Sequence, residues 1–104
     1  LVDGLPLRFT ASDRLKSFPT ERSAALLSQW KNDLPAMQKA LGLEASIIHV
    51  DSTDGLRVTL TTGDVVHLRP SGNAPELRCY AEAGTSEQAA KVAKKSLAAC
   101  AHFL

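Results

Sequence analysis

The hydrophobic residues of this sequence change their period once, near Ala45. Between positions 17 and 42 they recur at steps of three and four, which is typical of one face of an amphipathic helix. After Ala45 they alternate with polar residues in four short runs, which is typical of strands with one buried face. The helical face consists of apolar residues: Leu27, Trp30, Leu34, Met37 and Leu41. The sequence therefore predicts a helix followed by an antiparallel sheet.

Turn-forming residues separate the four runs. Asp54-Gly55 supplies the positive φ angles of a tight hairpin, and Thr62-Gly63-Asp64 makes the next turn. We expect strands at 46–51, 56–61, 65–69 and 77–83. The alternation predicts these inward side chains: Leu56, Val58, Leu60, Val66, Leu68, Leu77, Cys79 and Ala81. It predicts these outward side chains: Arg57, His67, Arg69, Arg78, Tyr80 and Glu82.

The helical segments have recognisable ends. Pro35 removes a backbone donor, so we expect a kink or a helix restart after position 32 or 33. Gly42 is a suitable stop for this first helical segment. Thr85, followed three residues later by Gln88, forms a capping box that opens a last helix over about 86–103.

A poorer alternation over residues 7–15 predicts one further strand before the first helix. The expected order is then strand, helix, four-strand meander, helix. This is an α+β fold, with an antiparallel sheet of four to five strands and two helices packed on one face. The 104 residues leave room for one domain, expected over 7–104.

Charge and cysteine content restrict the ligands and the cellular compartment that we expect for this domain. A net charge of +1 provides no long-range field that would attract nucleic acid or an anionic membrane. The sequence lacks a membrane-spanning apolar run and a signal peptide, which predicts a cytoplasmic protein. Cys79 and Cys100 lack zinc-site spacing and are expected to be reduced, buried thiols. The start at Leu1 and the turn-forming stretch to Pro6 predict an interdomain linker over 1–6, in a chain cut from a longer protein.

The connection between the last two strand runs carries more specialised residues than a hairpin requires. It offers anion donors: the Arg69 guanidinium, the Ser71 hydroxyl, the Asn73 amide and free backbone N–H groups at Ser71, Gly72 and Asn73. A proline on either side lowers its entropy, so these donors are held before a phosphate monoester arrives. An alternative is that these residues only form a turn and that Arg69 is a solvated strand residue. Composition alone favours this structural alternative over a phosphate site.

The run RPSGNAPELRCYAEA, residues 69–83, resembles the signature that closes the α-D-phosphohexomutases, whose usual form is R-P-S-G-T-E-P. DGLRVTLTTGDVVHLRPSG resembles the hairpin that precedes this signature, and LPLRFTASDRLKSFPTERS is similar to the hinge and first strand of the phosphomannomutase branch. The resemblance implies the last of four domains, with a TATA-binding-protein-like β-α-β4-α arrangement. It implies a C-terminal phosphosugar-binding domain of an enzyme that interconverts 1- and 6-phosphosugars.

The resemblance also implies roles for individual residues. Arg69 and Ser71 match the family's phosphate contacts, and Gly72 matches a position that donates its backbone N–H. Asn73 stands where threonine is usual, and its amide can donate to phosphate as a hydroxyl can. These four residues would hold the nonreacting phosphate of the substrate. Arg78 matches a recurrent arginine of the family and is a further candidate.

The resemblance places the chemistry outside this chain. Ala74 replaces the usual glutamate, which removes a like charge from an anion site. The family's phosphoserine, its magnesium-binding DGDxDR loop and its sugar-reading loop belong to other domains, and these motifs do not occur here. We therefore expect no catalytic residue, metal or other cofactor in this fragment, which should be inactive alone. Magnesium and the phosphoserine are expected in the full-length enzyme, and the expected partners are the phosphosugar and the other domains.

The role of the histidines and the functional class of the protein each have more than one interpretation. His49, His67 and His102 lie on different expected elements, without a metal-ligand spacing. Alternation puts His67 on the same face as Arg69, which makes it a further candidate for contact with sugar or phosphate. Asp13 and Arg14 are expected to form an exposed pair or a turn contact. A free-standing, non-catalytic phosphosugar-binding or interaction module remains the alternative, and nucleic-acid binding ranks third because the predicted sheet lacks an aromatic stripe.

Overall fold

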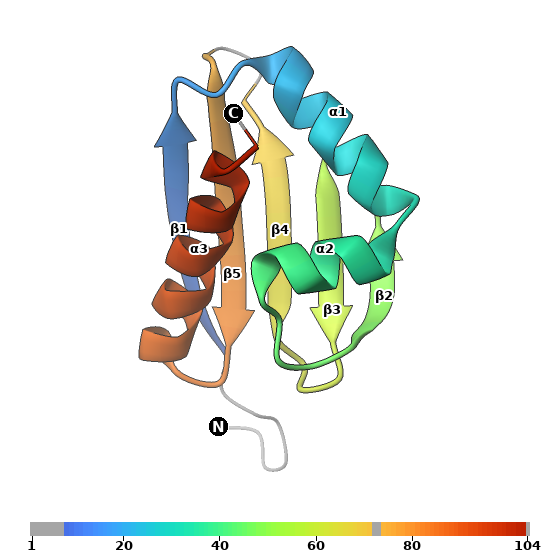
Figure 1. Cartoon of the computed structure of the whole chain (residues 1–104). Helices are drawn as coiled ribbons and strands as arrows, with labels where there is room; N and C mark the ends of the chain where they lie inside the picture. Colours follow the sequence, from blue (N-terminus) through green and yellow to red (C-terminus); the bar gives the residue numbers. More distant parts are fainter. Residues whose placement is uncertain (1–7, 72–73, 104) are drawn as a thin grey trace.

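The computed structural model describes residues 8–71 and 74–103, so the linker predicted over 1–6 lies outside the described residues (Figure 1). Five strands form one antiparallel sheet with the order β1-β5-β4-β3-β2. The elements are β1 (Phe9–Lys16), α1 (Thr20–Lys31), α2 (Leu34–Leu41), β2 (Ile47–Asp51), β3 (Leu56–Leu60), β4 (Val65–Pro70), β5 (Glu76–Ala83) and α3 (Ser86–Ala101). The predicted α+β class and antiparallel sheet are confirmed.

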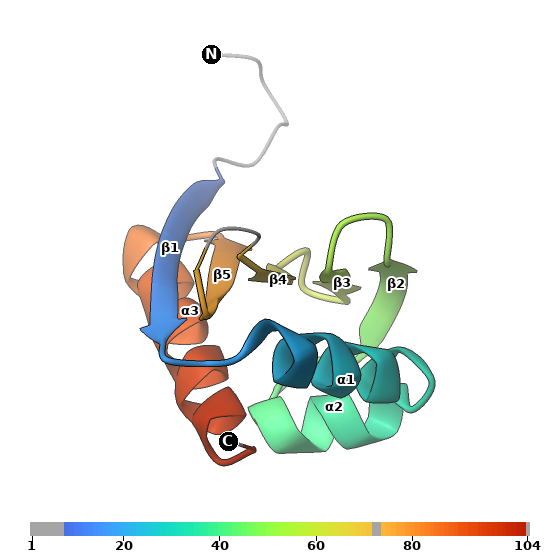
Figure 2. The same ribbon diagram turned by 90° about the horizontal axis from the view of Figure 1, so that it is seen from above.

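All three helices cover the same face of the sheet, as seen from above in Figure 2. No described helix or strand covers the other face, which we call the open face. The eight side chains predicted to point inward are at most 4% exposed. They pack against one cluster that also contains Leu26, Leu27 and Trp30 of α1, Met37 and Leu41 of α2, and Leu97 of α3. The alternation of the sequence therefore identified the buried face of each central strand.

The predicted break in the first helical segment is confirmed, so this segment forms the two helices α1 and α2. Pro35 occupies the first turn of α2, where its missing N–H leaves no helical hydrogen bond unmade. The Asp33 side chain caps this turn by accepting from the Ala36 N–H at 3.2 Å. Gly42 ends α2 in the left-handed conformation, with φ 62°. Leu34, predicted to be a core residue, is only half-buried because it begins the new helix.

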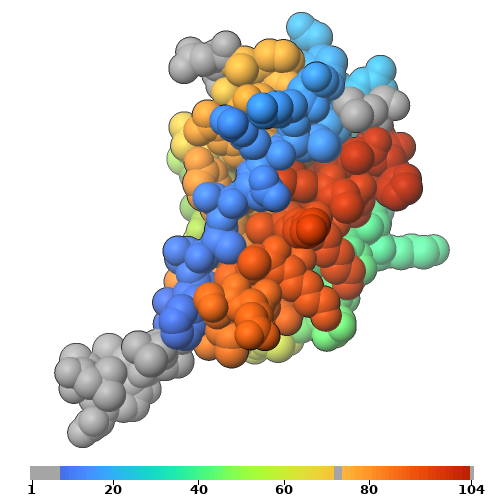
Figure 3. Space-filling view, turned by 90° about the vertical axis from the view of Figure 1, so that its left-hand side faces the viewer, coloured from blue at the N-terminus to red at the C-terminus, as the bar shows by residue number. Residues whose placement is uncertain are grey.

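Strand β1 is an edge strand. It pairs with β5, from Phe9 opposite Ala83 to Lys16 opposite Glu76. Figure 3 shows it running along the rim of the molecule beside α3. Its weak alternation follows from this position, because most of its side chains are exposed.

Helix α3 begins where the capping box predicted. The Thr85 hydroxyl oxygen accepts from the Gln88 N–H at 3.1 Å. The helix ends at Ala101, short of the predicted 103, because the His102 and Phe103 N–H groups bond to carbonyls only three residues back. No helix of the described residues is long and apolar enough to cross a membrane.

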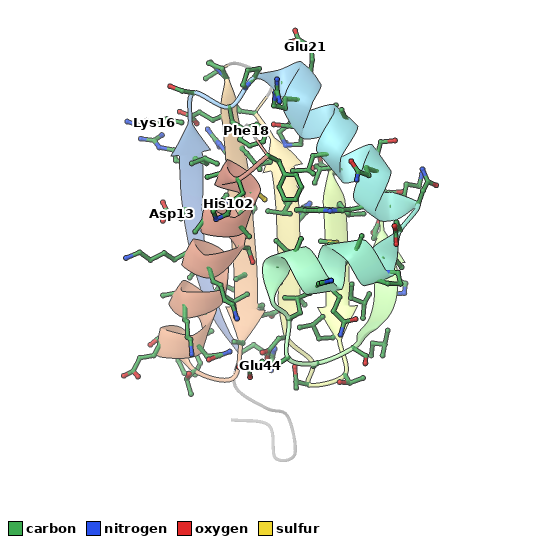
Figure 4. The ribbon with its side chains drawn as sticks, viewed as in Figure 1. Asp13, Lys16, Phe18, Glu21, Glu44 and His102 are labelled. Atoms are coloured by element: carbon green, nitrogen blue, oxygen red, sulfur yellow. The ribbon has the colours of Figure 1, made fainter. Side chains whose placement is uncertain are left out.

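The core contains one large side chain that periodicity did not reveal. Phe18 lies in the connection from β1 to α1 and is fully buried. In Figure 4 it is near the end of the sheet where α1 begins. A single apolar residue between two elements carries no period, so the sequence offered no signal for it.

Candidate functional site

The β4–β5 connection is fixed at both ends by backbone hydrogen bonds. The Ser71 N–H donates to the Glu76 carbonyl at 2.9 Å, and the Glu76 N–H donates to the Ala74 carbonyl at 2.8 Å. The Phe18 N–H donates to the Pro75 carbonyl at 2.7 Å, which ties the connection to the segment before α1. The first of these bonds joins the two ends of the connection to each other, the second lies within its β5 end, and the third holds it against the segment before α1, as a preformed binding loop requires.

One predicted donor of this loop is corrected by the structure. The Ser71 N–H is not free, because the β4–β5 ladder continues past Pro70 and uses it for the Glu76 carbonyl. The Ser71 side chain is also largely buried, since the residue is only 7% exposed. Its carbonyl accepts from the Thr20 hydroxyl at 3.5 Å. Gly72 and Asn73, the other predicted donors, lie outside the described residues.

Arg69 and Arg78 face each other directly across β4 and β5. Both side chains are on the open face, as alternation predicted, and each is about half exposed. Arg69 Nε lies 3.2 Å from Asp54 Oδ1, in the β2–β3 turn. Arg78 Nε lies 3.8 Å from Glu76 Oε2. The structure thus brings two predicted anion-binding residues together at the base of the loop.

His67 lies on the same face, two residues before Arg69. Its Nε2 bonds to the Asp54 carbonyl, and its ring lies 5.9 Å from the Tyr80 ring on β5. These contacts fix the tip of the β2–β3 hairpin beside Arg69. His49 is on β2, and His102, labelled in Figure 4, follows α3, so the structure keeps these two histidines on separate elements, as expected.

Sequence reasoning missed two charged residues of this region, Arg14 and Glu76. Arg14 on β1 lies directly opposite Arg78, and its Nη1 lies 3.8 Å from Glu76 Oε1. Of the two expected arrangements of Asp13 and Arg14, the structure shows an exposed pair within β1 and not a turn, and the Arg14 N–H donates to Asp13 Oδ1 at 2.8 Å. The sequence holds no signal for the neighbourhood of Arg14 and Arg78, because their proximity depends on the pairing of β1 with β5.

Both cysteines are free and buried, as predicted. Burial raises the pKa of each thiol to about 12, and the nearby Cys100 adds to the effect on Cys79. Thiols with such pKa values remain protonated at neutral pH and are poor nucleophiles and metal ligands. Among residues 8–71 and 74–103, no group of three or more His, Cys, Asp or Glu side chains could hold a metal ion.

A protein-family model described as "Phosphoglucomutase/phosphomannomutase, C-terminal domain" matches residues 19–99, which include α1, α2 and strands β2 to β5. The chain belongs to this family. The expected resemblance to the α-D-phosphohexomutases is therefore confirmed.

Two curated phosphomannomutases are similar to this phosphoglucomutase/phosphomannomutase C-terminal domain. The protein from Salmonella muenchen is 42% identical over 98 residues, which cover 93% of this chain and 20% of the relative. The protein from Sinorhizobium fredii (strain NBRC 101917 / NGR234) is 38% identical over 87 residues, covering 84% of this chain and 18% of the relative. The chain thus spans about one fifth of the length of these relatives, and most of its own length is matched.

Proposed function

We propose that this domain binds the nonreacting phosphate of a hexose phosphate within an enzyme that interconverts 1- and 6-phosphosugars. Membership of the phosphoglucomutase/phosphomannomutase family supports this class of substrate. The observation that carries the proposal is the direct pairing of Arg69 with Arg78 at the base of the β4–β5 connection. Each guanidinium has one carboxylate beside it, and each remains about half exposed, so both can still contact an anion at the open face.

The proposed grip combines charge with neutral donors. Arg69 and Arg78 supply guanidinium N–H groups, which match phosphate oxygens in geometry. The Ser71 hydroxyl, the Gly72 N–H and the Asn73 amide complete the set that family resemblance implies. Ala74 leaves the loop without the carboxylate that is usual there, so no side-chain charge at this position opposes the phosphate.

A phosphate grip suits a mutase because it does not depend on which hydroxyl carries the ester. The substrate and the reversed intermediate each present one phosphate to this domain, and the binding energy positions the other end for reaction. We propose that the phosphoserine and the magnesium ion act from the other domains. The isolated domain should not turn over substrate, because the family's phosphoserine and magnesium-binding motifs do not occur in its sequence.

An amide NMR titration of this chain tests the grip. Mannose 1-phosphate and glucose 6-phosphate should shift the amide signals of Ser71, Gly72 and Asn73, whereas free mannose should not. Arg69→Gln should weaken binding of both phosphates. Arg22→Gln is the matched control, because it removes the same charge from α1, where Arg22 contacts the Phe103 carbonyl instead. Binding that survives Arg69→Gln unchanged, or shifts with free mannose alone, would contradict the proposal.

A complementation experiment distinguishes a mutase domain from a free-standing module. The chain is added to a truncated mutase that lacks its last domain, and mutase activity is measured. Recovery of mutase activity supports the enzyme domain. Phosphate binding without recovery favours the non-catalytic module.

A further inference from the structure

A third arginine extends the Arg69–Arg78 pair across the sheet. Arg14, Arg78 and Arg69 occupy directly opposed positions on β1, β5 and β4. We call these residues the arginine row. Their Cα atoms follow the strand spacing of about 4.8 Å, so flexible guanidinium groups can converge above the open face. Like charges in directly opposed positions destabilise a sheet, so the row requires counter-ions.

Two carboxylates offset two of the three positive charges of the row, and they differ in how firmly they are held. Glu76 lies between Arg14 and Arg78, at 3.8 Å from each, and its side chain is only 14% exposed. Asp54 contacts Arg69 from a turn, and its side chain is 59% exposed. Glu76 is therefore a fixed counter-ion, whereas Asp54 can be displaced at little cost. The position of Glu76 also demonstrates that Arg14 and Arg78 can reach one carboxylate-sized group together.

Space for a ligand lies beside the row. A surface hollow of about 310 Å³ is lined by Ser12, Asp13, Arg14, Arg78 and Tyr80. Asp13 lines this hollow, and Lys16 is on the same strand; Figure 4 shows both along the outer edge of β1. Asp13 stands opposite Cys79, whose buried side chain is on the helix-covered face, so Asp13 belongs to the rim of the hollow and not to the open face. Lys16 is not among the residues that line the hollow. The charge available to a ligand is then set by the arginine row and by Glu76.

We propose that Arg14 is a specificity-determining residue that matches this site to a dianion. With Glu76 retained and Asp54 displaced, the arginine row keeps two uncompensated positive charges, which equal the charge of a phosphate monoester above its second pKa of about 6. Without Arg14 only one uncompensated charge remains, which suits a monoanion. This inference rests on the proposed phosphate grip, and it assigns to β1 a part in ligand recognition.

The test compares a dianion with a monoanion of the same shape. Glucose 6-phosphate and glucose 6-sulfate are titrated separately against the chain and its variants by calorimetry or NMR. The unchanged chain should bind the phosphate ester more tightly. Arg14→Gln should weaken phosphate binding by about five- to tenfold and change sulfate binding by less than about twofold. Arg14→Lys, which keeps the charge, should restore most of the preference.

The outcomes separate this inference from the proposed function. Arg69→Gln should weaken both ligands, because Arg69 belongs to the grip itself, and Arg22→Gln should change neither. If Arg69→Gln weakens binding while Arg14→Gln leaves the phosphate-to-sulfate ratio unchanged, the grip stands and the role of Arg14 is overturned. If neither ligand binds the unchanged chain, both proposals are overturned. Circular dichroism of each variant excludes loss of folding as the cause.

Discussion

Gly55, in the β2–β3 turn, lies where the fold has no room for a side chain. Its φ is +74°, and a Cβ atom there would overlap the Leu68 carbonyl oxygen and lie 3.0 Å from the Arg69 Cα. Both neighbours are backbone atoms of β4, which cannot rotate away. The close approach brings the turn that carries Asp54 against Arg69, so this glycine serves the candidate site as well as the fold.

Gly55→Ala should therefore lower the free energy of unfolding by about 2–4 kcal/mol, through strain and overlap. Gly84→Ala is the matched control, because a Cβ at Gly84 meets nothing within 4 Å. Its effect should stay within about 0.5 kcal/mol. Urea unfolding of both variants measures the difference. Equal losses of stability would show that the close approach at Gly55 is not what restricts this position.

Asp54 competes with any anion for Arg69, since its carboxylate lies 3.2 Å from the guanidinium. Asp54→Asn should strengthen glucose 6-phosphate binding by about 1.4- to fivefold, the range that an exposed ion pair of about 0.2–1 kcal/mol allows. Glu44→Gln removes the same charge at the end of the molecule opposite the β4–β5 connection (Figure 4). A calorimetric titration that finds the same gain in both variants would indicate a general charge effect and not local competition.

At the scale of elements, the sequence predicted what local rules control. The proline restart between α1 and α2, the Thr85 cap and the alternation of β3, β4 and β5 all depend on residues within a few positions of one another. The end of α3 was placed two residues too late, because fraying at a helix terminus leaves little sequence signal. Phe18 and the opposition of Arg14 to Arg78 depend on contacts between distant segments, so local rules could not reveal them.

The packing of α3 on β5 buries both thiols and makes the stability of this contact depend on pH. The folded-state pKa of Cys79 and of Cys100 is raised to about 12 from an ordinary 9.0. Between these values the unfolded chain loses thiol protons that the folded chain keeps. Stability therefore falls as pH rises through this window, and the thiol contribution is fully present below pH 9.

The double variant Cys79→Ala/Cys100→Ala should lose stability at every pH, because it leaves cavities in the core. Its further loss between about pH 8 and about pH 10 should nevertheless be smaller than that of the unchanged chain. Urea unfolding at both pH values gives the change in stability of each protein. The effect of lysine and tyrosine titration on stability is the same in both proteins, so it cancels when the two changes are compared. Parallel losses in the two proteins would argue against a thiol contribution.

At the scale of the whole molecule, the helices and the sheet share one hydrophobic core. Trp30 is 1% exposed and belongs to the same cluster as residues of α2, α3 and the sheet. The Phe103 ring lies edge-on to the indole, with ring centres 5.6 Å apart. Unfolding followed by tryptophan fluorescence and by far-UV circular dichroism should therefore give one coincident transition. Separate midpoints would show that the sheet and the helices unfold independently.

Phe103→Ala should change the near-UV circular dichroism of Trp30 and lower stability by about 1 kcal/mol. Phe9→Ala is the control, because Phe9 is 40% exposed, close to the 39% of Phe103, but lies on β1. It should leave the tryptophan signal unchanged. If both substitutions alter this signal equally, the edge-on ring contact is not its source.

The candidate site is a property of the whole sheet. Sequence motifs predicted Arg69, Ser71 and Arg78 as site residues, because the signature runs continuously along the chain. They did not reveal that the Ser71 N–H belongs to the strand ladder, since hydrogen-bond register is set by the pairing of β4 with β5. The electrostatic balance of the site likewise depends on Glu76 and Asp54, whose counter-ion roles require three-dimensional neighbours.

The pairing of β1 with β5 has a consequence for how the chain is made. Phe9 leaves the ribosome long before Ala83, the residue it will face in the sheet. During most of synthesis β1 therefore has no partner, while α1, α2 and the hairpins of β2, β3 and β4 can already form from sequential neighbours. Closing such a distant contact is slow, and an unpaired strand can meet other chains. The nascent domain is thus most exposed to misassembly just before β5 emerges from the ribosome.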